Sequence, residues 1–241
     1  MAITSTVSGT TSFNLDLNNL VEEAFERCGA ELRTGYDLKT ARRSLNLLTI
    51  EWANRGINLW TIEQGEIPLV KGQSVYDLPV DTIDLLDHVV RTGTGQNQLD
   101  INITRISEST YITIPNKNAQ GRPIQVWINR QSGASYPTGV KNPQINVWPA
   151  PDQNSNYTFF YYRLRRIQDA GDGGSHMQDI PFRFLPCLVA GLSYHLSLKV
   201  PGGLERTAML KAEYEQAFQL AADEDREKAS IRLAPRQQFI R

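Results

Sequence analysis

Long apolar runs, a strong net charge and a secretion signal are all missing from this sequence, and each absence excludes a class of function. No apolar run reaches about 18 residues, so no segment is predicted to span a membrane. The net charge of −1 gives no overall positive field that would attract nucleic acid. The Ser/Thr-rich segment Met1–Ser12 lacks a basic start and an apolar stretch, so we expect an extended arm rather than a signal peptide.

Residues that bind metals or carry redox chemistry are also scarce. The chain has three histidines, His88, His176 and His195, and two cysteines, Cys28 and Cys187. Each cysteine falls in an apolar helical pattern, which predicts a buried, reduced thiol in a cytoplasmic product. No spacing among these residues forms a ligand set, so we expect no bound metal ion.

No motif for catalysis accompanies this composition. No serine stands in a Gly-x-Ser-x-Gly frame, and no nucleophile–base or carboxylate pair can be placed. Gly-x-Gly occurs at Gly93–Gly95 and Gly171–Gly173, but neither continues into a phosphate-binding fingerprint, so a turn and a loop are expected there. We therefore expect no catalytic residue, no cofactor and no enzyme activity.

Amphipathic helical patterns are present at both ends of the chain. They predict four helices, over Asp16–Glu31, Asp37–Arg55, Asp179–Val200 and Leu204–Ala229. Asp16 is the expected N-cap of the first helix, and Gly56 stands where the second should end. The third helix is apolar on almost every side, which predicts the centre of a bundle capped by Asp179. Pro186 should bend this helix or delay its start, and Gly191 should let another helix approach closely.

Short strand patterns separated by turn residues fill the middle of the chain. Eight strands are predicted: Ile57–Glu63, Glu66–Val70, Ser74–Leu78, Leu85–Thr92, Leu99–Ile106, Ile124–Asn129, Gln144–Trp148 and Tyr157–Leu164. Turns such as Lys71-Gly72 and Gly121-Arg122-Pro123 separate them. Strands at this spacing favour a small sandwich or barrel, but the spacing does not define which strands pair.

These patterns predict an α+β fold, in which both termini form a helical bundle and an antiparallel β domain, a small sandwich or barrel, is inserted between them. The expected parts are an N-terminal arm (1–15), a helical bundle (16–56 and 177–229), a β domain (57–176) and a C-terminal tail (230–241). The strongest apolar stripes predict one shared core in the bundle, made of Leu45, Leu48, Trp52, Leu188, Leu192 and Phe218. Glu224 and Lys228 are expected to form an exposed pair on the last helix.

Several segments carry a likeness to a known family, in the same order along the chain. They are Ile67-Pro68-Leu69-Val70-Lys71-Gly72-Gln73-Ser74-Val75-Tyr76-Asp77-Leu78-Pro79, Val147-Trp148-Pro149-Ala150-Pro151, Phe159-Phe160-Tyr161-Tyr162-Arg163 and Glu213-Tyr214. With the helical opening, they cover most of residues 15–230 and resemble the head-to-tail adaptor proteins of tailed bacteriophages. The likeness is strongest to the tail tubular protein A type of short-tailed phages. It implies a helical bundle bearing a β domain, with no catalytic residues.

The resemblance also implies a structural virion protein, made in the host cytoplasm and placed at the head–tail junction. Its expected partners are the portal protein, the downstream tail (nozzle) protein and copies of itself in a ring, commonly dodecameric. DNA would pass through this ring during ejection without sequence-specific binding, and a net charge of −1 agrees with a channel that does not grip DNA. A ring subunit needs two different lateral faces, because head-to-tail contacts are heterologous.

The C-terminal tail is the candidate assembly interface. Ser230–Arg241 contains three arginines and no acidic residue, together with more apolar residues than a solvated tail requires. Pro235 prevents a simple continuation of the preceding helix. The residues expected to dock on a neighbouring subunit or on the portal are Arg232, Leu233, Arg236, Phe239, Ile240 and Arg241.

Two features leave other functions open. Trp60, Trp127 and Trp148 would suit a carbohydrate- or ligand-binding β module on a helical stalk, although packing on alternate faces of a sheet explains them as well. The aromatic run Phe159–Tyr162 is followed by Arg163, Arg165 and Arg166, and this basic-aromatic cluster would suit contact with nucleic acid. A strand that ends in a charged edge is the simpler interpretation.

Overall fold

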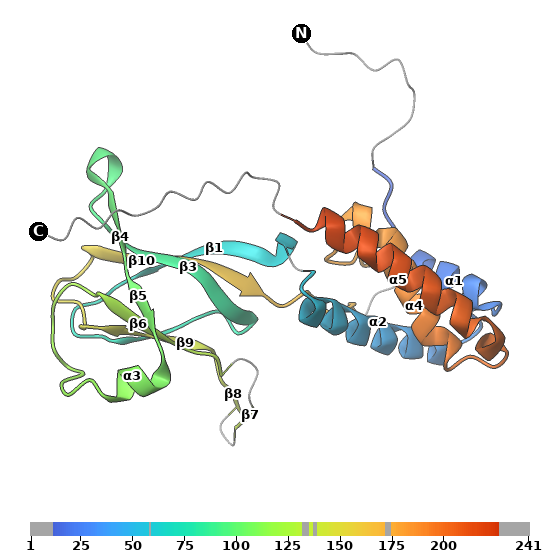
Figure 1. The fold of residues 1–241 in the computed structure, drawn as a ribbon, viewed down its shortest axis with the longest axis horizontal. Coiled ribbons are helices and arrows are strands. Elements are labelled where there is room, and N and C mark those ends of the chain that lie inside the picture. The colour runs from blue at the N-terminus through green and yellow to red at the C-terminus, as the bar shows by residue number, and fades with distance from the viewer. Residues whose placement is uncertain (1–11, 58, 132–134, 137–138, 172–174, 227–241) are drawn as a thin grey trace, which may run out of the picture. The chain divides into compact units, whose positions relative to one another are not determined.

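The computed structural model describes residues 12–57, 59–131, 135–136, 139–171 and 175–226. The chain divides into two compact units, each with its own core (Figure 1). The first unit comprises Met1–Leu59 and Asp169–Arg241 and is helical. The second comprises Trp60–Gln168 and is built mainly of strands. The predicted α+β class, a helical part from both chain ends and a β part between them, is confirmed.

Four long helices make up the helical unit: α1 (Leu17–Cys28), α2 (Gly35–Arg55), α4 (Leu185–Ser197) and α5 (Thr207–Glu224). Helix α4 packs against each of the other three, which explains why almost all of its residues are apolar. The six residues of the predicted shared core are all buried, with at most 4% of any one exposed. Gly191 lies at the closest approach: a Cβ atom there would stand 2.9 Å from atoms of both Leu48 and Tyr214.

The sequence signals at the helix ends correspond to observed caps. The Asp16 side chain accepts a hydrogen bond from the Asn19 backbone N–H and so caps α1. Helix α2 begins two residues earlier than predicted, because Thr34 and Asp37 form a reciprocal capping box. Gly56 ends α2 in the left-handed region, at φ 89°, where a Cβ atom would be strained.

The start of the third predicted helix is different from the expectation. Helix α4 begins at Leu185, after a short 3-10 turn η3 (Phe182–Phe184), so Asp179 does not cap it and that prediction is wrong. Pro186 lies in the first turn, where its missing N–H costs nothing, and this delays the helix as expected. A second 3-10 turn, η4 (Gly203–Arg206), precedes α5. Glu224 pairs with Arg183 at 3.8 Å, and its predicted partner Lys228 lies outside the described residues.

The β unit contains two four-stranded sheets that face each other. The first has the order β1 (Ile62–Pro68), β10 (Tyr157–Arg165), β3 (Thr82–Thr92) and β4 (Leu99–Asn102), all antiparallel. The second has the order β2 (Val75–Asp77), β9 (Gln144–Trp148), β6 (Gln125–Asn129) and β5 (Thr104–Ile106). The remaining elements are the short helix α3 (Glu108–Ile112), the 3-10 turns η1 (Leu59–Thr61) and η2 (Gly95–Asn97), and the hairpin β7 (Ser135–Tyr136) and β8 (Gly139–Val140).

The two sheets form a sandwich, and within the described residues no sheet closes into a barrel. Their inward side chains, including Phe159, Val126 and Val147, form one cluster of buried residues. The expectation of a wholly antiparallel domain needs one correction, because β5 pairs with β6 in parallel. Strand β5 reaches this position because the predicted strand Leu99–Ile106 breaks at Ile103 and continues in the other sheet.

The first two predicted strands also require correction. The strand predicted from Ile57 begins only at Ile62, because Leu59–Thr61 form the 3-10 turn η1, and Ile57 is a buried residue just beyond the end of α2. A single strand, β1, then runs through Gly65 where the sequence indicated a break. Gly65 is accommodated because the Tyr161 ring of the neighbouring strand occupies the space that a side chain there would fill.

Candidate functional site

The predicted assembly interface, Arg232, Leu233, Arg236, Phe239, Ile240 and Arg241, lies outside the described residues. In the described part of the chain, the features that could form a functional site are its polar clusters, its hollows and its exposed apolar surfaces. The clusters are described first, because they include the histidines, cysteines and arginines that the sequence singled out.

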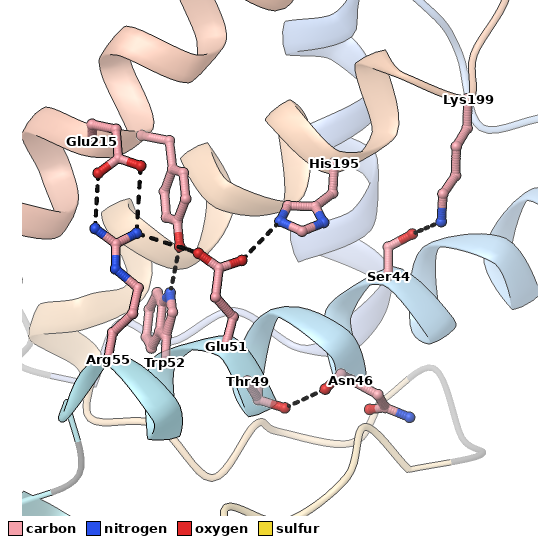
Figure 2. Close-up of polar contacts among 10 residues, drawn as sticks. Ser44, Asn46, Thr49, Glu51, Trp52, Arg55, His195, Lys199 and Glu215 are labelled. Carbon is pink, nitrogen blue, oxygen red and sulfur yellow. Dashed lines mark hydrogen bonds and ion pairs between the residues drawn. The ribbon is translucent and has the colours of Figure 1, made fainter.

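A polar cluster ties three helices of the bundle together (Figure 2). Glu51 of α2 accepts a hydrogen bond from the Tyr214 hydroxyl at 3.0 Å and lies 3.3 Å from Nε2 of His195. Arg55, one turn further along α2, pairs with Glu215 of α5 at 2.8 Å. Trp52 Nε1 donates to the Tyr214 oxygen at 3.2 Å, which connects this cluster to the core.

The interactions in this cluster are of the kind that hold helices together. Burial, and then the nearby charge of Glu51, raise the pKa of Tyr214, so its hydroxyl remains a hydrogen-bond donor. The Arg55 guanidinium lies 3.4 Å from the centre of the Phe218 ring, so the same cation makes a cation–π contact as well as its ion pair with Glu215. Among the described hollows, none is lined by Glu51, His195 or Tyr214.

Both cysteines are buried and free, as the sequence predicts. The Cys28 sulfur lies 3.1 Å from the Ser193 carbonyl oxygen, and burial raises its pKa to about 11. Burial raises the pKa of Cys187 to about 12. Neither thiol forms the reactive thiolate near neutral pH. In the part of the chain that the structure describes, no three His, Cys, Asp or Glu side chains are grouped to hold a metal ion.

The arginines at the end of β10 are held by carboxylates. Arg163 pairs with Asp81 at 2.6 Å and with Glu63 at 2.8 Å, and its side chain is only 11% exposed. Arg165 pairs with Glu63 at 2.5 Å. Burial alone would raise the pKa of Asp81, but hydrogen bonding to Arg163 and the charge of Arg163 outweigh it and lower that pKa. These arginines brace strands β1, β3 and β10, and they do not form an open basic surface for nucleic acid.

Two of the three tryptophans that the sequence singles out, Trp127 and Trp148, contact neighbouring residues as well. The Trp127 ring stacks on Tyr111 of α3, with 5.1 Å between ring centres. Trp148 Nε1 donates to the Asn116 carbonyl at 2.9 Å. Both are half-buried on the outer face of the second sheet. A small hollow beside Trp127 is lined by Arg105 and other residues, but Arg105 already pairs with Asp84 at 2.9 Å. The aromatic platform expected of a carbohydrate-binding module is thus largely used in packing.

An apolar groove with an acidic rim lies between α1 and α4 of the helical unit. We call it the α1–α4 groove. Its exposed apolar residues are Phe13 and Phe182, which are 74% and 71% exposed. Glu22 and Glu26 of α1 form its rim and are exposed to solvent. The sequence missed this groove because Phe182 was assigned to the buried helix, whereas it lies in η3 ahead of that helix.

A second unusual surface lies on the outer face of α2. Tyr36, Lys39, Arg43, Leu47 and Ile50 are exposed and recur every three or four residues. We call this set the α2 stripe. No acidic residue occurs between Asp37 and Glu51, so the stripe combines apolar and positive side chains. Sequence reasoning found the buried stripe of α2 and gave no weight to the apolar residues on the opposite face.

The comparisons with known proteins agree with a structural function. In both units, the polar clusters hold elements together, as is expected of a structural protein. A family model described as SU10 adaptor protein matches residues 15–237. The chain therefore belongs to the SU10 adaptor protein family, and so to the structural adaptors of the bacteriophage head–tail junction. Among curated proteins, none matches the chain. None of the described helices is both long and apolar enough to cross a membrane.

Proposed function

We propose that the chain is the subunit of an adaptor ring that joins the portal of a short-tailed phage to its downstream tail (nozzle) protein. The observation that carries the proposal is the family match over residues 15–237, which spans both units. The ring is dodecameric and of the tail tubular protein A type, and it lines the passage through which DNA leaves the head. The near-neutral net charge of −1 supports a passage that does not retain DNA.

The C-terminal tail, Ser230–Arg241, docks on the portal or on a neighbouring subunit. Arg232, Arg236 and Arg241 supply charge, and the apolar residues between them supply contact area. Docking would offset the entropy that is lost when such a segment becomes ordered. The proposed ligand-binding alternative has no comparable support, because Trp127 and Trp148 are already packed against Tyr111 and Asn116.

The test combines purified protein with portal particles. We expect the full chain to form a ring on the portal that electron microscopy detects, and a variant deleted after Ala229 to remain folded but fail to bind. A second variant, Arg232→Glu with Arg236→Glu and Arg241→Glu, keeps the tail length and should also fail, because the portal or neighbouring surface would then meet the opposite charge. Unchanged binding of both variants would remove the tail from the interface. A full chain that never binds the portal would refute the adaptor function.

A further inference from the structure

Two surfaces of the helical unit are complementary in character. The α1–α4 groove, of about 750 Å³, is apolar with an acidic rim, and the α2 stripe is apolar with a basic centre. The two surfaces share no residue and are formed by different helices, although both helices pack on α4. A pair of surfaces with these properties suits a heterologous contact, in which one face of a subunit binds a different face of the next.

The charges of both surfaces are available for such a contact. Within the described residues, no ion pair engages Glu22 or Glu26 on the groove, and none engages Lys39 or Arg43 on the stripe. Glu23, by contrast, is paired with Arg27 at 2.9 Å, and Arg27 in turn with Glu213 at 2.6 Å. Among the described residues, Glu22 and Glu26 are therefore exposed and unpaired at the groove rim, whereas the ion pair of Arg27 with Glu213 joins α1 to α5.

The apolar parts also match. The exposed rings of Phe13 and Phe182 lie on the groove, and Leu47 and Ile50 project from the stripe. Large apolar side chains that stay exposed beside polar and charged residues are typical of interaction surfaces. The stripe is carried on α2, a helix of 21 residues whose opposite face is fixed in the core by Leu45, Leu48 and Trp52. It is thus a rigid ridge of the kind that an apolar groove accepts.

We propose that the α2 stripe of one copy of this chain docks in the α1–α4 groove of the next copy. The occupant of the groove is a second copy, because the opposite charges of the two surfaces make them complementary to each other. The contact uses Glu22 and Glu26 on one side, and Lys39 and Arg43 on the other. It is heterologous, so repetition of one contact generates a ring if the rotation closes. The inference rests on the proposed function in that it names the faces that meet within the ring.

Charge exchange tests the contact directly, with the purified full-length chain and no portal present. One variant carries Glu22→Lys and Glu26→Lys, and the other carries Lys39→Glu and Arg43→Glu. Each variant places like charges on both surfaces, so we expect its self-association to be weaker than that of the unaltered chain by about tenfold or more in sedimentation equilibrium. An equimolar mixture of the two, and the variant with all four substitutions, restore opposite charges and should recover association.

A matched control separates this contact from a general effect of charge. Glu108→Lys with Glu205→Lys makes the same change in net charge as Glu22→Lys with Glu26→Lys, at exposed positions that belong to neither surface, and it should associate like the unaltered chain. Thermal unfolding of every variant confirms that the subunits are folded. Association of the unaltered chain should also weaken as salt is raised, because exposed charges are screened.

Three results would overturn the inference. They are a chain that stays monomeric at low salt and high concentration, reversed variants that associate normally, and a mixture that fails to recover association. If deletion after Ala229 abolished association while the charge exchanges had no effect, the tail and not the α2 stripe would be the occupant. Portal binding is measured separately, so a failed contact between these faces leaves the adaptor function standing, and loss of portal binding leaves the contact standing.

Discussion

His88 illustrates how a single side chain is determined by its surroundings. Its ring stacks on Phe159 with 5.7 Å between ring centres, and both ring nitrogens are buried. Burial, and then the positive charge of Arg105, lower the pKa of His88 below 6.5, and the opposing effect of Asp87 is smaller. The sequence predicts no metal-ligand set that includes His88. The structure instead assigns it to the packing between the sheets.

The lowered pKa predicts an acid sensitivity of the β unit. In the unfolded chain His88 has a pKa of about 6.5, whereas in the folded chain the pKa of His88 is lower, so it is protonated only at a lower pH. Stability contributed by neutral His88 is therefore full above about pH 6.5 and is lost as the pH falls from there toward the folded pKa. We expect His88→Phe to be less sensitive than the unaltered chain in this window, as measured by urea unfolding at pH 7.5 and at about pH 5. Equal losses in both proteins would show that His88 is not responsible.

At the scale of the helix, close packing around α4 explains the observed sequence. Gly191 leaves room for Leu48 and Tyr214, and Pro186 starts the helix where no backbone donor is required. The polar cluster of Glu51, Arg55 and Tyr214 then fixes α2 and α5 relative to one another. Helix propensity alone would not keep α2 and α4 in place, since most helical stability comes from burial of the apolar face.

Truncation of core leucines should therefore be costly. Leu48→Ala and Leu192→Ala each remove a fully buried side chain, and we expect each to lower the free energy of unfolding by about 2–5 kcal/mol. Leu47→Ala and Leu198→Ala are the matched controls, because both side chains are more than half exposed, at 55% and 54%. Denaturant unfolding measures all four. Similar midpoints for Leu48→Ala and Leu47→Ala would contradict the bundle core described above.

The apolar spacing in the sequence predicted the elements whose buried positions follow a regular pattern. Helices α1, α2 and α5 were found because one face of each is buried and the apolar spacing records it, and α4 was found because it is apolar on almost every side. Asp179 was wrongly chosen as a cap, because a polar residue before an apolar run looks the same whether a helix or a 3-10 turn follows. The parallel pairing of β5 with β6 was not predictable, since pairing depends on contacts between distant segments.

The candidate surfaces show the same limit. The α2 stripe was present in the sequence as Leu47 and Ile50, but a helix that is apolar on its outer face also fits a helix buried on all sides. The structure shows that Leu47 and Ile50 remain exposed while Leu45 and Leu48 are buried. The α1–α4 groove depends on Phe13 and Phe182, which are far apart in the sequence and line the same groove only in the folded unit.

At the scale of the whole molecule, the two cores are separate, and substitutions should act on one unit at a time. Phe159→Ala in the sandwich should cost about 3–5 kcal/mol and increase amide hydrogen exchange across Trp60–Gln168. Leu192→Ala should instead increase exchange in the helices. Mass spectrometry of exchanged peptides measures both effects. Equal loss of protection in both units, for either variant, would show that they unfold as one cooperative body.

Construction of the bundle from both ends of the chain has a consequence for synthesis on the ribosome. Strands β1 to β10 are complete before α4 and α5 emerge, so the sandwich can fold while the chain is still growing. Helices α1 and α2 must wait for α4, their packing partner, across more than a hundred residues of intervening chain. Both the groove and the polar cluster that fixes α5 are finished last. An interrupted chain therefore lacks these surfaces. Under the proposed contact between copies it could not join finished subunits, so the order of synthesis would act as a check on completeness.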